Sequence, residues 1–565
     1  MSKNSIWLVV AILCSFYFWT ALSNGLPFDV SKGKNNFQNN DNISPEVQSA
    51  IPSYGYYNWL ADSLLNGKLE MPMKPNPKLL ELSNPYDVLA NAGLNALDLS
   101  LYKGKYYMYF GIIPAITGFI PSRLLGFVPN QGMIAAIYAT AALIFGCIIL
   151  LDIQKHYNIS KSVLLVGILV FGMGNYLPLL LRRPAVYEVA IAAGACFSTL
   201  GLLCLIRSIT ARNIIYLAAA SLSIGLAVGS RPSYIITSGF LLCGLYSCWG
   251  KKHALTATVL PILIVGVMLA SYNYARFESP LEFGVKYQLS SINLDPAGRN
   301  RIQNLTASAP SYLFTPPKLS PTFPFILPRA TPIKTPKIFY GNDELIGLVF
   351  MVPIIILGAL GAVSSKIRNT PYFAIPIGYG VAILTFMTFS FPAIHPRYQP
   401  DFAIPLILGL IGGWMIISME KRGIKQLGFV AAGVTIIVGL LTSLTGAQNL
   451  LFKAHPELIK LADVLQFPNS SKTTSLLDAT NLNGWNNLDG KNWYFRIYSP
   501  EEKEWNLSYE AIVQPVTEVN GACVDRIVTF KKGINWLVLR PVGKQHNTLG
   551  KITITSGAEA IHLAP

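Results

Sequence analysis

Carboxylates that could act as a catalytic base gather in the polar segment 24–105, which holds 8 of the 28 acidic residues of the chain. Asp29, Asp62 and Asp98 are the candidates, because a transferase that acts on a hydroxyl needs a carboxylate within hydrogen-bond reach to take its proton. Asp98 is the first choice, since Lys105 and a Tyr-Tyr pair follow it closely. For each aspartate alone, a solvated-loop or helix-cap role is the alternative.

Basic side chains form the second candidate group, and arginine is its main member. A planar guanidinium binds phosphate through a fork of N–H donors, so arginines gathered at one membrane face predict a site for a lipid-linked phosphate. Snorkelling of each side chain to lipid headgroups is the alternative. The candidate donor-binding residues are Arg182, Arg183, Arg231, Arg276, His395, Arg397, Tyr398 and Lys105.

The elements that must position these residues are membrane helices. Of the 565 residues, 52% are hydrophobic and only 13% are charged, far from the roughly 25% charged residues of soluble domains. The sequence therefore predicts an all-α polytopic membrane protein with about 11 to 13 transmembrane helices, each near the ~20 residues needed to cross. The apolar runs are 6–22, 131–151, 162–181, 185–206, 213–229, 233–249, 254–271, 345–363, 371–391, 402–418 and 424–443.

Lysines and arginines in the short loops orient these helices. They fall in alternate connections, for example Lys155 and Lys161, which the positive-inside rule assigns to the cytoplasm. The N-terminus is then cytoplasmic. The loops 24–105 and 272–344, and the chain after residue 444, are expected outside the cytoplasm. The candidate arginines at helix ends thus lie on the side where the rule does not expect them.

The segment 106–127 is long enough to cross but contains two prolines, and we interpret it as re-entrant or as a short hairpin. The formal net charge of +16 comes largely from the loops expected in the cytoplasm, where lysines and arginines can bind anionic lipid headgroups. A nucleic-acid partner is therefore not expected. No cysteine cluster of a disulfide framework or metal type is readable.

The pattern changes after the last apolar run. A linker at 446–471 precedes short runs of β-formers separated by Gly, Asn and Pro, which predict an extracytoplasmic β-sandwich-like domain at 472–565. Trp485, Trp493 and Trp505 could stack on sugars there, although a role in the core of the sandwich is the favoured interpretation. The transmembrane domain with its two large loops then occupies residues 1–445.

Charged groups inside the apolar runs are scarce. A transporter or pump is expected to place carboxylates near the bilayer centre, whereas Asp152 and Glu188 lie toward run ends. A flippase or export component, which needs a continuous polar path, is therefore disfavoured. The polar residues that could do chemistry gather instead at the outer face.

These features together resemble the C-type (GT-C) integral-membrane glycosyltransferases, especially bacterial family 39-like relatives of protein mannosyltransferases and aminoarabinose transferases. The resemblance covers about residues 1–445 and is carried by 58–67, 98–107, 273–284 and 397–401. It implies a bacterial inner-membrane enzyme that transfers a sugar, with inversion, from a polyprenyl-phosphate donor to a cell-envelope acceptor. A first-loop aspartate would be the base, and basic residues would hold the donor phosphate.

The chain departs from the family pattern at two places. Many relatives carry an Asp-Glu pair where residues 52–55 read Pro-Ser-Tyr-Gly, and Lys-Pro-Pro where 110–114 read Phe-Gly-Ile-Ile-Pro. A degenerate, non-catalytic member is therefore one alternative, and a polysaccharide polymerase or ligase is another. The residues establish no cofactor, and a divalent metal stays an open alternative.

Overall fold

In a computed structural model of the chain, the described residues are 3–23, 55–91, 93–94, 96, 98–290, 301–319, 325–335, 341–445, 493–499, 502–511, 516–519, 522–531, 533–540, 549–556 and 559–563. Asp29 lies outside them, as do the linker 446–471 and Trp485. The chain divides into two compact units. One comprises Met1–Leu22, Pro27–Pro317 and Pro328–Ser443, and the other comprises Ser23–Leu26, Lys318–Leu327 and Leu444–Pro565.

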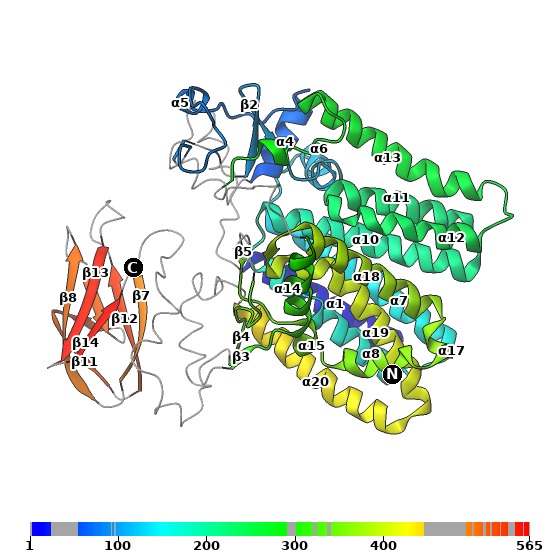
Figure 1. Ribbon diagram of the computed structural model, residues 1–565. Helices are drawn as coiled ribbons and strands as arrows, with labels where there is room; N and C mark the ends of the chain where they lie inside the picture. Colours follow the sequence, from blue (N-terminus) through cyan, green and yellow to red (C-terminus); the bar gives the residue numbers. More distant parts are fainter. Residues whose placement is uncertain are drawn as a thin grey trace. The chain divides into compact units, whose positions relative to one another are not determined.

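The first unit is a bundle of apolar helices (Figure 1). In the part of the chain that the structure describes, eight helices are long and apolar enough to cross a membrane, which confirms the predicted membrane class. The main helices are α1 (Lys3–Leu22), α7 (Gln131–Tyr157), α8 (Lys161–Gly174), α9 (Leu177–Leu181), α10 (Val186–Ala211), α11 (Ile214–Ser230), α12 (Leu241–Ser247), α13 (Ala254–Phe277), α18 (Pro371–Ser390), α19 (Gln399–Glu420) and α20 (Arg422–Thr445).

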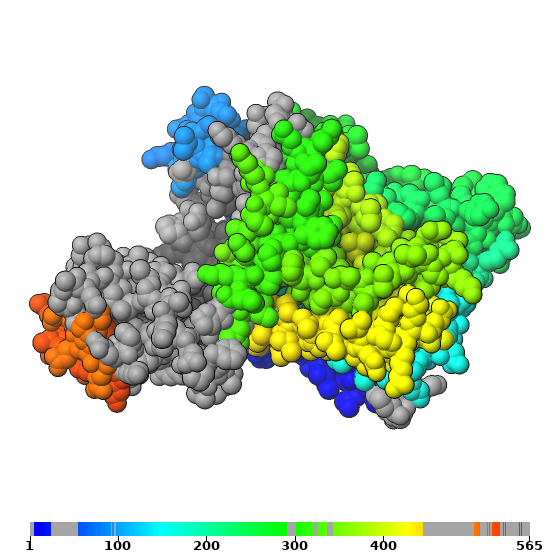
Figure 2. All heavy atoms as spheres, turned by 60° about the horizontal axis from the view of Figure 1, so that its bottom comes forward, coloured from blue at the N-terminus to red at the C-terminus, as the bar shows by residue number. Residues whose placement is uncertain are grey.

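Helix α10 occupies the centre of the bundle, packed against α7 and α11. Small residues permit this close approach, as they commonly do between membrane helices. A Cβ added at Gly194 would lie 2.7 Å from the ring of Tyr234, and one at Gly201 would lie 3.0 Å from Ile224. The outermost helices instead turn apolar side chains outward. Figure 2 shows α20 on the surface of the bundle, where Val430 is 68% exposed.

Three of the predicted runs do not form single α-helices. The run 162–181 forms α8 and α9, which are separated at Asn175 and Tyr176. The run 233–249 begins with the 3₁₀-helix η2 (Pro232–Phe240) and continues as α12. The run 345–363 forms α15 (Leu348–Met351), α16 (Ile354–Ala359) and the 3₁₀ turn η4 (Leu360–Ala362). Pro353 stands at the break, because proline has no N–H for the helical ladder. The number of crossings stays a prediction.

The segments expected outside the cytoplasm contain short elements of their own. They are α4 (Tyr56–Leu65), α5 (Pro77–Leu80), β1 (Leu99–Tyr102), β2 (Lys105–Met108), the π-helix η1 (Ala115–Phe119), α6 (Ile120–Leu124), η3 (Val285–Tyr287), α14 (Arg301–Phe314), β5 (Gly341–Asn342), β6 (Ala393–Ile394) and η5 (Pro396–Tyr398). The helices η1 and α6 are together shorter than the ~20 residues of a crossing, and the interpretation of 106–127 as re-entrant or as a short hairpin stays a prediction.

The second unit contains two four-stranded antiparallel sheets, with strand orders β10-β9-β12-β7 and β11-β8-β13-β14. Trp505 is only 2% exposed and its ring lies 6.5 Å from that of Phe530, so it belongs to the core, as the sequence favoured. The strands are β7 (Trp493–Ser499), β8 (Lys503–Ala511), β9 (Val516–Val519), β10 (Ala522–Val524), β11 (Ile527–Phe530), β12 (Gly533–Arg540), β13 (Leu549–Ser556), β14 (Glu559–Leu563), and a separate pair β3 (Lys318–Leu319) and β4 (Ile326–Leu327).

Candidate functional site

Three of the predicted basic residues, Arg183, Arg231 and His395, occupy breaks between helices, immediately before a proline. Arg231 separates α11 from η2 and has extended backbone angles of φ −147° and ψ 116°. His395 precedes η5, with φ −130° and ψ 129°. A residue before proline is pushed out of the helical region and into extended conformations. The sequence therefore forces the chain to bend at these positions, and each bend is followed by a new helical turn.

Asp98 is positioned by the hairpin of β1 and β2. Its φ of 64° lies in the left-handed region, which aspartate tolerates better than most residues. The backbone N–H of Asp98 donates to the carbonyl of Leu289 at 3.0 Å, and the side-chain amide of Gln288 donates to its carboxylate at 3.1 Å. Two loops that are distant in sequence thus fix the orientation of this carboxylate.

Tyr187, in the first turn of α10, connects Asp98 to the basic residues. Its hydroxyl accepts a hydrogen bond of 3.0 Å from Tyr109 and interacts electrostatically with the Asp98 carboxylate. The guanidinium of Arg397 lies over the same ring, 4.2 Å from its centroid. The predicted base and a predicted phosphate ligand therefore contact one tyrosine that the sequence analysis did not single out.

Two arginines lie near a second aromatic ring, that of Tyr398. The guanidinium of Arg397 lies 5.7 Å from its centroid and that of Arg231 lies 5.2 Å from it. The Nε atoms of both arginines are buried and have no hydrogen-bond partner among the described residues. An unpaired buried donor is costly, so two such N–H groups at one place favour an anionic ligand.

Two carboxylates, Asp343 and Glu188, interact with Arg397. Nδ1 of His395 is 2.6 Å from a carboxylate oxygen of Asp343, and Asp343 also interacts electrostatically with Arg397 and Arg183. Glu188, in α10, interacts with the same two arginines. β5 pairs with β6 in parallel, and the N–H of Asp343, the residue after β5, donates to the carbonyl of Ile394. This pairing places Asp343 next to His395.

Sequence reasoning missed Asp343 and set Glu188 aside as a residue of a helix end. No local signal marks Asp343, since its partner is distant in the chain. A signal existed for Glu188, whose carboxylate accepts a hydrogen bond from the N–H of Ala185 at the start of α10. An acidic residue three positions after a helix begins is typical of a cap.

The pKa of Asp343 makes the pairing with His395 testable. Burial alone would raise this pKa, but the hydrogen bond from His395 and the charges of Arg397 and Arg183 hold it below its ordinary value. A carboxyl with a lowered folded-state pKa stabilises the fold above its unfolded pKa of about 3.9, and that stability is lost as the pH falls through the folded pKa.

We therefore expect Asp343→Asn to flatten the loss of thermal stability between about pH 5 and pH 3. The melting temperature of the detergent-solubilised protein measures this, with Glu344→Gln, the exposed neighbouring residue, as the control. An equal acid-induced loss in the wild type and Asp343→Asn would contradict the pairing.

Arg182 and Arg183 are adjacent, but only Arg183 joins the site. Arg182 is 1% exposed, and its guanidinium donates to the carbonyls of Ser443 at 2.5 Å and Thr20 at 3.3 Å. It also lies 4.5 Å from the ring centroid of Trp19. Arg182 therefore ties α1 to α20, and the predicted phosphate contact is replaced by a structural one.

Replacing Arg182 by alanine is expected to destabilise the bundle by about 2–4 kcal/mol, because two buried carbonyls lose a charged donor. Thermal unfolding of the purified protein measures this, and Arg183→Ala, at an exposed position, is the matched control. An Arg182→Ala protein as stable as the control would show that the tie contributes little.

The remaining predicted residues have other polar partners or are outside the described residues. Asp62 is ion-paired with Arg123, and Lys105 is ion-paired with Glu70 at 3.2 Å. Arg276 donates to the carbonyl of Met108 at 2.5 Å and stacks on Tyr272, with 3.9 Å to its centroid. Asp29 is not among the described residues. No group of three or more metal-ligating side chains occurs in the described part of the chain.

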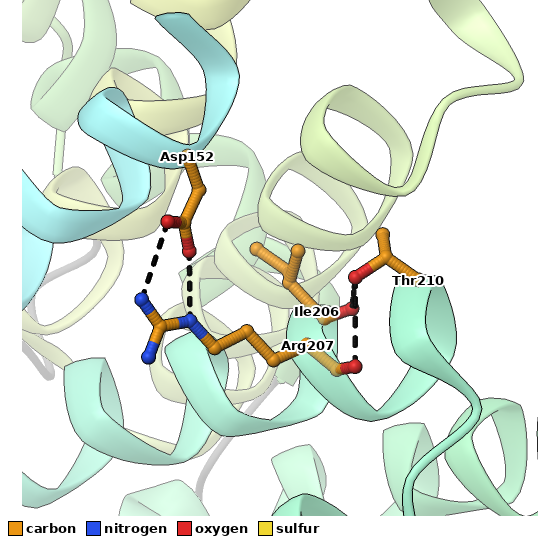
Figure 3. A network of polar contacts seen from close by, with 4 residues as sticks. All are labelled: Asp152, Ile206, Arg207 and Thr210. Atoms are coloured by element: carbon orange, nitrogen blue, oxygen red, sulfur yellow. Dashed lines mark hydrogen bonds and ion pairs between the residues drawn. The ribbon is translucent and has the colours of Figure 1, made fainter. Parts of the chain in front are cut away.

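The opposite end of α10 carries a different polar contact (Figure 3). Arg207 donates to the two carboxylate oxygens of Asp152 at 2.8 and 3.2 Å, a forked ion pair between α10 and α7. At 1.5 Å per residue, Arg207 lies about 30 Å from Tyr187 along the helix. Arg207 and Asp152 pair with one another, whereas the Nε–H groups of Arg397 and Arg231 have no partner among the described residues.

Comparisons with known proteins show no family. No protein-family model matches the chain, and no curated protein matches it. Two solved structures of the Archaeoglobus fulgidus oligosaccharyltransferase align with it, one in the apo form and one, of AglB, in complex with an inhibitory peptide and a dolichol-phosphate. Each alignment has 12% identity and a TM-score of 0.38, and covers 85% of this chain but 60% of the other. A likeness this low carries no argument about function.

Proposed function

We propose that the chain is a GT-C type glycosyltransferase of the bacterial inner membrane, which moves a sugar from a polyprenyl-phosphate donor to a cell-envelope acceptor on the extracytoplasmic side. One observation carries the proposal: a carboxylate, Asp98, and a cation with an unpaired buried N–H, Arg397, meet at Tyr187. A base for the acceptor and a ligand for the leaving phosphate are the two groups that this reaction needs.

Asp98 accepts the proton of the acceptor hydroxyl as its oxygen attacks the anomeric carbon of the donor sugar. Gln288 and the left-handed backbone conformation of Asp98 hold the carboxylate in place. The new carbon–oxygen bond forms on the face opposite to the phosphate, so the sugar is transferred with inversion. The acceptor proton ends on Asp98, from which solvent removes it.

Arg397 stabilises the other half of the reaction. The bond between the anomeric carbon and the phosphate oxygen breaks, and its electron pair leaves with the polyprenyl phosphate. Negative charge grows on that phosphate, and fixed N–H donors aimed at developing charge supply a large share of catalysis. Arg231, His395 and Arg397 all contact the ring of Tyr398. Arg183 and Arg397 both interact electrostatically with Asp343.

The test is transfer of labelled sugar by the purified full-length protein in liposomes. A panel of undecaprenyl-phosphate sugars is offered together with extracted envelope acceptors. We expect one donor to be consumed, with one undecaprenyl phosphate released per sugar transferred. If the wild-type protein consumes no donor in the panel while it remains folded, the transferase proposal fails, and a non-catalytic export component takes its place.

A further inference from the structure

Arg231 has a buried counter-ion of its own, in addition to its contact with the Tyr398 ring. Its Nη2 atom is 3.0 Å from a carboxylate oxygen of Asp401, in the first turn of α19, and the Asp401 side chain is 0% exposed. The hydroxyl of Tyr234 donates to the other oxygen of the same carboxylate at 2.8 Å. Arg231 and Tyr234 therefore both contact the Asp401 carboxylate. The Arg231 guanidinium in turn lies between Asp401 and the ring of Tyr398.

The close packing around this ion pair depends on a glycine of α10. A Cβ on Gly194 of α10 would lie 2.7 Å from the Tyr234 ring and 3.4 Å from Cδ of Arg231. The contact with Arg231 would be ordinary, but the approach to the Tyr234 ring is too close for a Cβ without movement of that ring. A negative charge near the start of α19 is also favoured by the helix dipole. Three helices, α10, α11 and α19, thus fix one ion pair beside the candidate phosphate site.

Nothing in the proposed reaction uses a carboxylate at this position. A buried ion pair beside well-packed residues adds little to stability compared with an apolar replacement, so stability alone is a weak reason for it. Its electrostatic effect on the site is larger. Asp401 offsets the positive charge of Arg231 but leaves its buried Nε–H group without a hydrogen-bond partner among the described residues.

We propose that Asp401 is a positioning residue that orients Arg231 and balances its charge, so that the site holds the polyprenyl phosphate product weakly enough to release it. This inference rests on the proposed function, because it assumes that the anion is a lipid-linked phosphate. An interaction that binds the donor and the product equally well lowers KM without raising kcat, and release of a tightly held product can limit turnover.

The experiment measures binding of undecaprenyl phosphate, without sugar or acceptor, to the full-length protein in detergent. Removing the carboxylate by Asp401→Asn is expected to tighten binding about tenfold, because Arg231 becomes an uncompensated cation beside the phosphate. In the transfer reaction the same variant should have a lower KM for the donor and a lower kcat. A merely structural carboxylate would leave the affinity of the folded protein unchanged.

Two further variants cover the case in which Asp401→Asn does not fold. Tyr234→Phe disturbs the same buried group but keeps both charges, so its affinity should stay within about twofold of the wild type. The double variant Arg231→Gln with Asp401→Asn removes both charges together and should bind undecaprenyl phosphate at least about threefold more tightly than Arg231→Gln alone, which leaves the carboxylate unbalanced.

The outcomes are distinguishable. The charge balance is overturned if Arg231→Gln and the double variant weaken binding of undecaprenyl phosphate equally. It is also overturned if folded Asp401→Asn binds no more tightly than the wild type. In both cases the transferase proposal stands. If the wild-type protein does not bind undecaprenyl phosphate at all, the proposed function and this inference both fail.

Discussion

Replacing Asp98 by asparagine is expected to lower the rate of sugar transfer about 10²–10⁴-fold, the contribution usual for a general base. Asparagine keeps the shape of the side chain and can still meet Gln288, but it cannot accept the acceptor proton. Binding of the donor should be nearly unchanged, because Asp98 does not contact the phosphate in the proposed arrangement. The measurement is single-turnover transfer with the donor bound in advance.

Asp62→Asn is the matched control for this experiment. Asp62 was the second candidate base, lies in the same outer segment, and is ion-paired with Arg123. We expect a change in stability but little change in the rate of transfer by the folded protein. If Asp62→Asn abolishes transfer while Asp98→Asn retains it, the base has been assigned to the wrong carboxylate.

Replacing Arg397 by glutamine is expected to lower kcat/KM about 10²–10³-fold, the loss usual when one donor to developing charge is removed. Arg397 interacts with Glu188 and Asp343 and stacks on Tyr187, so its removal also leaves two carboxylates facing the phosphate. Binding of undecaprenyl phosphate should therefore weaken as well. Transfer kinetics and phosphate binding together measure both effects.

Arg397→Lys separates charge from geometry. Lysine keeps the positive charge but lacks the planar fork and stacks less well on tyrosine, so an intermediate loss is expected. The control for a general effect of lost surface charge is Arg301→Gln, an exposed arginine that lies over Phe389. Transfer at the wild-type rate by folded Arg397→Gln would remove Arg397 from the site.

How far the sequence could predict this site depends on the range of each interaction. The bends at Arg231 and His395 were predictable in principle, because proline restricts the residue before it, and both residues occur at helix ends as expected. The membrane class followed from the apolar runs. These are local properties, and composition or dipeptide rules capture them.

The contacts between elements were not accessible in the same way. Tyr187 meets Asp98 only because the start of α10 lies close to the residues that flank the β1–β2 hairpin. Asp343 meets His395 only through the pairing of β5 with β6. Arg182 and Arg183 look alike in the sequence, yet one faces the interior of the bundle and the other is exposed. Adjacent residues after a helix point in different directions, and only the packing decides which direction is inward.

The most direct test is an experimental structure of the full-length protein with undecaprenyl phosphate bound. We expect the phosphate within hydrogen-bond distance of the Arg397 guanidinium and on the same side of Tyr187 as the Asp98 carboxylate, with Arg231 still paired to Asp401. A phosphate bound at Arg276, or at the Asp152–Arg207 end of α10, would contradict the proposed site.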